Sequence, residues 1–107
     1  MRVDALLRSR AVAATDHARR YMIQLAKHWD HKYEVAFDDA QARITLPMGL
    51  CLMVAEPGCL TVTVEAGGAE TLARIETVVA KHLYRFSFRE PDLVLAWEPV
   101  SPGASAA

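Results

Sequence analysis

The side chains best suited to chemistry gather in one stretch, residues 17–32, which contains three of the four histidines of this 107-residue chain. His28 and His31 are three positions apart, so on a helix their imidazoles lie about one turn apart on the same face. Such a pair can converge on one metal ion, and imidazole nitrogens suit both zinc and iron. The spacing therefore makes His28 and His31 the candidate metal ligands.

Further hydrogen-bonding side chains belong to the same arrangement. His17 lies about three helical turns before His28, and Tyr21 falls in the row between them. His82 belongs to a second predicted helix, at the boundary between core and solvent. Two interpretations stay open. Either these histidines bind a ligand such as iron, haem or zinc, or they cap the core and bond to backbone carbonyls.

Nucleophilic catalysis has less support from the sequence. Cys51 and Cys59 fall in or at the ends of predicted strands, where nothing nearby would lower a thiol pKa. In the predicted register they are on the order of 13 Å apart, too far for a disulfide. The pair Gly67-Gly68 opens a helix but lacks the lysine and threonine of a phosphate-binding loop. We therefore predict a protein that is not an enzyme.

The composition and net charge of the chain limit the kinds of partner that it can bind. The chain is 52% apolar and 23% charged, which is typical of a globular protein. A net charge of −1 offers no basic field for nucleic acid or for an anionic membrane. No apolar run approaches the ~20 residues that cross a bilayer. Two cysteines without an export signal indicate reduced thiols, so we expect a cytoplasmic protein.

Two amphipathic helices are predicted from a period of 3.6 residues. The first covers residues 16–31, with Thr15 as its N-cap. The second covers about residues 69–85, followed by an extended segment to Glu90. Their core-facing residues are predicted to be Ala18, Met22, Leu25, Ala26 and Trp29 in the first helix, and Leu72, Ile75, Val79, Leu83 and Phe86 at the second.

Four hairpin-linked strands separate the helices, beginning with residues 33–37 and 42–46. Residues 47–49 and 56–58 are interpreted as three-residue turns, which pair Leu52 with Ile44 and Val62 on the core side. A one-residue slip would turn a whole strand over, so the apolar pattern decides this register. It places Cys51, Met53, Thr61 and Thr63 on the outer face, a surface suited to a partner or a second copy.

The predicted fold is a two-layer α+β sandwich: an antiparallel sheet with two helices on one face. Residues 1–8 are expected to be weakly ordered, residues 9–98 to form one domain, and residues 99–107 to be a disordered tail. A short strand is expected at residues 9–14. A last strand at residues 93–97 is expected to run antiparallel to the first strand of the meander.

Several segments resemble the bacterial domain-of-unknown-function 2218 family. They are residues 25–32 (Leu-Ala-Lys-His-Trp-Asp-His-Lys), residues 37–39 (Phe-Asp-Asp), the block at residues 79–90 that contains His82, and Trp97. The likeness covers Ser9 to Glu98. The family pattern often has cysteine before Lys-His, where this chain has Ala26, so a site that combines thiol and histidine is not supported.

What the resemblance implies is limited, because the family has no established activity. Similar domains occur alone or attached to siderophore-interacting flavin reductases, which implies a place in iron acquisition and such a reductase as partner. The motif histidines carry over as His28, His31 and His82. Its charged residues carry over as Lys32, Arg85, Arg89 and Glu90.

Two functions are therefore compared. The first is a small accessory domain linked to iron or siderophore handling, in which His28 and His31 face the ligand and His82, Tyr21 and Arg89 support them. The second is an interaction or dimerisation module with purely structural histidines.

Overall fold

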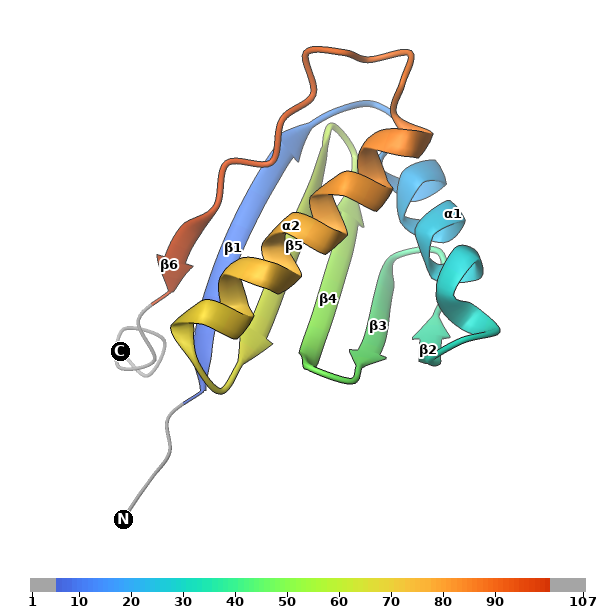
Figure 1. The fold of residues 1–107 in the computed structure, drawn as a ribbon. Helices are drawn as coiled ribbons and strands as arrows, with labels where there is room; N and C mark the ends of the chain where they lie inside the picture. The colour runs from blue at the N-terminus through green and yellow to red at the C-terminus, as the bar shows by residue number, and fades with distance from the viewer. Residues whose placement is uncertain (1–5, 101–107) are drawn as a thin grey trace.

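The computed structural model describes residues 6–100, which form one antiparallel sheet and two helices (Figure 1). Strands lie in the order β2-β3-β4-β5-β1-β6. This confirms the predicted α+β fold with an antiparallel sheet. The elements are β1 (Leu7–Ala14), α1 (Ala18–Asp30), β2 (Glu34–Phe37), β3 (Gln41–Leu46), β4 (Gly49–Glu56), β5 (Cys59–Ala66), α2 (Ala69–Phe86) and β6 (Glu98–Val100).

Both helices cover the same face of the sheet (Figure 1). Helix α1 buries all five residues predicted for its core face, and Tyr21 with them. Helix α2 buries Ile75, Val79 and Leu83, while Leu72 and Phe86 pack at the margin of the core. The helical period therefore predicted both faces correctly. Neither described helix has the length and apolar character needed to cross a bilayer.

Helix α1 begins later than predicted. Its first residue is Ala18, and its N-cap is His17, which has no side-chain capping bond. Thr15 is not the cap, but its hydroxyl accepts a bond from the backbone N–H of His17 at 3.0 Å. Helix α2 continues to Phe86, so the extended segment predicted from residue 85 is wrong at its start.

The register of β4 differs from the prediction by one residue. Both of its turns have two residues, because Leu46 pairs with Gly49 and Glu56 pairs with Cys59. Gly58 has φ of 90°, so the Pro57-Gly58 turn follows the type II pattern. As a result Cys51 and Met53 are fully buried, and the predicted outer placement of both is wrong.

The first and last strands also differ from expectation. Strand β1 begins at Leu7, so Leu7 and Arg8 belong to the sheet rather than to a weakly ordered N-terminus. Strand β6 begins at Glu98, beyond the predicted residues 93–97, and pairs antiparallel with β1 instead of with β2. Residues 99 and 100 of β6 belong to the segment that was expected to be a disordered tail. The other predictions about order concern residues 1–5 and 101–107, which lie outside the described residues.

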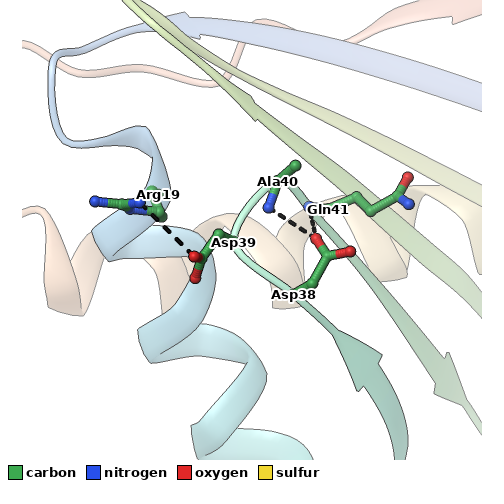
Figure 2. Close-up of polar contacts among 5 residues, drawn as sticks. All are labelled: Arg19, Asp38, Asp39, Ala40 and Gln41. Carbon is green, nitrogen blue, oxygen red and sulfur yellow. Dashed lines mark hydrogen bonds and ion pairs between the residues drawn. The ribbon is translucent and has the colours of Figure 1, made fainter.

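The turn between β2 and β3 is held by Asp38 (Figure 2). Its Oδ1 accepts bonds from the backbone N–H groups of Ala40 and Gln41 at 2.8 and 2.9 Å, and these bonds lower the pKa of Asp38. Asp39 lies 3.9 Å from a guanidinium nitrogen of Arg19 on α1, an exposed ion pair. The Asp38 carboxylate is thus a turn-forming group, whereas that of Asp39 pairs with α1.

Candidate functional site

His28 on α1 and His82 on α2 bring their imidazole rings together, with 5.5 Å between the ring centroids. The ring of Trp29 lies 5.1 Å from that of His82, and the ring of Phe86 lies 5.9 Å from that of His28. His28 is exposed and His82 is half-buried. We call these four residues the imidazole site. It lies at the surface where the two helices meet.

The hydrogen bond of His82 determines which of its ring nitrogens is free. Nδ1 lies 2.8 Å from the carbonyl oxygen of Val78, one turn earlier on α2. A carbonyl oxygen only accepts hydrogen bonds, so Nδ1 must donate its proton. In the neutral ring Nε2 therefore keeps its lone pair. Histidines that bind ligands through one nitrogen are commonly oriented in this way by the other.

The surroundings of His28 favour its neutral form. Partial desolvation against the neighbouring rings lowers the pKa of His28 from its usual 6.5, and nearby basic groups lower it further. Those groups are His82, Arg85, His31 and Lys32. At neutral pH the site therefore combines the uncharged imidazole of His28 with the positive charges of Arg85 and Lys32.

Two imidazoles alone do not make a closed metal centre. Within residues 6–100, no three or more histidine, cysteine, aspartate or glutamate side chains are placed to hold a metal ion. A structural zinc ion needs four ligands. A haem needs a concave apolar pocket, whereas the ring of His28 is exposed. Resident zinc or haem therefore does not fit, and the charges suit an anion that brings its own donor atoms.

The other residues predicted for the site are more scattered. His31 is exposed and is the C-cap of α1. Its charge helps to lower the pKa of His28, but the imidazole ring that lies beside His28 is that of His82. Arg89 is exposed in the segment after α2, where its guanidinium lies 5.6 Å from the ring of Phe88. The geometry thus joins His28 to His82 from the other helix.

Tyr21 belongs to a different group, which joins the start of α1 to the segment after α2. Its hydroxyl donates to Oε1 of Glu90 at 2.5 Å, and the hydroxyl of Thr15 donates to the same oxygen at 2.6 Å. We call Thr15, Tyr21 and Glu90 the polar cluster. Hydrogen bonds from Thr15 and Tyr21 lower the pKa of Glu90, while burial and the bond to Glu90 raise that of Tyr21. At neutral pH the carboxylate is charged and the phenol is not, so the cluster is suited to holding the two segments together.

Sequence reasoning missed this cluster. Thr15 was predicted as a helix cap and Glu90 as a charged residue of the family motif, but 75 positions separate them. No periodicity links residues at that distance. The only signal in the sequence was that Thr15 and Glu90 each lie at the end of a predicted element.

Cys51 is excluded as a nucleophile by its position. It is fully buried on the core face of β4, and burial raises its pKa to about 12. Cys51 and Cys59 are both free thiols, as the predicted distance between them required.

The fold and the site together define a small two-layer α+β domain with an imidazole pair between its helices. The family model described as "Uncharacterized protein conserved in bacteria (DUF2218)" matches residues 10–98. The chain therefore belongs to the DUF2218 family, as the resemblance predicted.

A solved structure agrees with this assignment. The chain is similar to the protein in the "NMR structure of PA4090 from Pseudomonas aeruginosa", with 33% sequence identity and a TM-score of 0.73. The alignment covers 86% of this chain and 95% of that chain. A search of the curated proteins finds no match.

Proposed function

We propose that this protein is a non-enzymatic binding domain whose imidazole site takes an anionic iron chelate with aromatic groups, of the siderophore type. One observation carries the proposal: His28 and His82 lie side by side among basic neighbours, although they come from different helices. The likeness to domains attached to siderophore-interacting flavin reductases supports iron as the cargo. It also makes such a reductase the proposed partner.

The chemistry of the site favours a chelate over a bare ion. A chelated ferric ion keeps the oxygen atoms of its chelator, so the protein needs only to recognise the outside of the complex. Arg85 and Lys32 supply positive charge for an anion, and Arg85 can also donate two parallel hydrogen bonds. The ring of Phe86, half-buried beside His28, can pack against an aromatic group of the ligand.

A binding role also agrees with the remaining polar groups. The carboxylate of Glu90 is engaged by two hydroxyls, and the thiol of Cys51 is buried. Neither supplies a nucleophile with a base beside it. We further propose a cytoplasmic location, which the two free thiols support.

Titration with a ferric tris-catecholate complex tests the proposal. Binding is followed by quenching of tryptophan fluorescence, since Trp29 contacts His82. We expect the His28→Ala/His82→Ala variant to bind at least tenfold more weakly, which corresponds to about 1.4 kcal/mol. Free Fe²⁺, Zn²⁺ and haem, titrated in parallel, should bind more weakly than the catecholate complex.

The matched control is His17→Ala, which removes an exposed histidine beside α1 that is not in the imidazole site. Its affinity should equal that of the natural protein. If the double variant binds as tightly as the control, the proposal is wrong. A lower melting temperature of the double variant with unchanged binding would show instead that the two histidines are structural.

A further inference from the structure

The sheet face away from the helices carries three rows of side chains that follow the strand register. Outward residues on β4 are Leu50, Leu52 and Val54, and they form an apolar stripe along the middle of this open face. Val54 is 41% exposed, and Leu50 and Leu52 are half-buried. Threonines of β5 lie on one side of the stripe and polar residues of β3 on the other.

Opposite charges lie at equal distances on either side of this stripe. Strand β2, two strands away from β4 in one direction, carries Glu34 outward. Strand β1, two strands away in the other direction, carries Arg8 and Arg10 outward. Nε of Arg8 lies 2.8 Å from Oε2 of Glu65 on β5, and Arg10 is in register with Glu98 on β6. The register places Glu34, Leu50 and Arg8 in one row across the sheet.

We infer that the open face binds a second copy of this chain, face to face, around a two-fold axis parallel to β4. Rotation about this axis leaves each row at the same height along the strands. It places β2 of one copy opposite β1 of the other. Leu50, Leu52 and Val54 then meet their own equivalents on the axis. Glu34 of each copy faces Arg8 of the other, with Arg10 one row away. The charges of one copy thereby complement those of the other.

The alternative two-fold axis, perpendicular to the strands, is disfavoured by the same charges. It would place each strand opposite its own equivalent, so Arg43 would face Arg43 and Arg10 would face Arg10 across the interface. Like charges brought together in this way weaken association. In the arrangement with the axis parallel to β4, Arg43 faces Thr63 of the second copy, next to Glu65.

The shape of the open face agrees with this arrangement. A hollow of about 500 Å³ lies over β2, β3 and β4, and its lining combines the outward Ala36, Leu52 and Val54 with Asp38 and Arg43. Val12 on β1 is 56% exposed and shares a row with Val54 and Gln41. Exchange of β1 with β2 places Val12 of each copy at the hollow of the other, where its side chain can leave water.

The available area indicates a weak dimer. Five strands spaced ~4.8 Å apart, with a rise of ~3.3 Å per residue over the eight residues of β4, give a face of roughly 600 Å² per copy. The total of roughly 1,200 Å² lies at the lower limit of specific interfaces. The dimer should therefore be reversible and depend on concentration.

Sedimentation velocity of the full chain, from about 1 µM to about 1 mM, measures the association directly. The natural sequence should shift from monomer to dimer over this range. Leu52→Lys places two lysines against each other on the axis and should weaken association at least 100-fold. Because Leu52 is on the surface, its replacement should leave the melting temperature nearly unchanged. A natural protein that stays monomeric throughout would overturn the inference.

A charge exchange tests the axis itself. Glu34→Arg and Arg8→Glu should each weaken self-association, since each places like charges opposite one another at both ends of the interface. Mixing the two variants should restore the dimer, because the mixed pair has opposite charges at both ends. Arg74→Glu, on the exposed side of α2, is the matched control and should dimerise normally. Mixed variants that remain monomeric would refute this axis.

Discussion

Glu90 accepts two hydrogen bonds on one carboxylate oxygen, from Thr15 and Tyr21. These bonds favour the ionised form, and so they lower the pKa of Glu90 below its usual 4.5. A group whose pKa is lower in the folded state than in the unfolded state stabilises the fold. This stabilisation is complete at pH values above the unfolded-state pKa, and it is lost as the pH falls through the folded-state pKa. Glu90 thus contributes a pH-dependent contact between α1 and the segment after α2.

Glu90→Gln should therefore lower the melting temperature at pH 7, and the difference from the natural protein should shrink below about pH 4.5. Glutamine keeps an oxygen acceptor, so the change removes the charge while both hydroxyls keep a partner. Thermal unfolding followed by circular dichroism between pH 7 and pH 3 measures the effect. Asp92→Asn, at an exposed acid of the same segment, is the control. A difference that did not change with pH would contradict this account of Glu90.

At the scale of the elements, Gly49 shows how β4 and α2 approach each other. An added Cβ would overlap the carbonyl oxygen of Glu65 on β5 and lie 2.6 Å from Cδ1 of Ile75 on α2. Gly49→Ala should therefore lower the free energy of unfolding by about 1–3 kcal/mol. Gly67→Ala, where no atom lies within 4 Å of the added carbon, should change it by less than about 0.5 kcal/mol. Urea denaturation of both variants measures the contrast, and equal effects would show that Gly49 is not constrained.

The register of β4 could not be read from its own residues. Residues 50–54 are all apolar, so alternation does not distinguish the core face from the open face. Leu52 was expected inside because three-residue turns paired it with Ile44 and Val62 on one continuous apolar face, yet Cys51 is the residue in the core. The turn Pro57-Gly58 carried the correct information, since proline followed by glycine suits a two-residue type II turn. In the helices, polar residues on the opposite face made the period unambiguous.

At the scale of the whole molecule, the candidate site depends on where two helices cross. The sequence predicted that His28 lies at the edge of α1 and that His82 lies beside the core stripe of α2. It could not predict their contact, because the relative position of two helices is set by packing over the sheet. Only the fold therefore shows that the imidazole of His82 lies beside that of His28.

The two proposed surfaces lie on opposite sides of the sheet, with the buried core between the helices and the strands (Figure 1). The imidazole site belongs to the helical layer, and the apolar stripe of β4 belongs to the open face. We expect the two to act independently. Monomeric Leu52→Lys protein should bind ferric tris-catecholate with an affinity within twofold of that of the natural protein, a coupling free energy below about 0.4 kcal/mol.

His28→Ala/His82→Ala protein should likewise dimerise as the natural sequence does, because neither imidazole reaches the open face. Fluorescence titration of the first variant and sedimentation of the second measure the two halves of this expectation. Reciprocity requires that any coupling appear equally in both directions, so the two experiments check each other. A tenfold change in either would mean that the sheet transmits about 1.4 kcal/mol between its faces, and the surfaces would then have to be treated as one site.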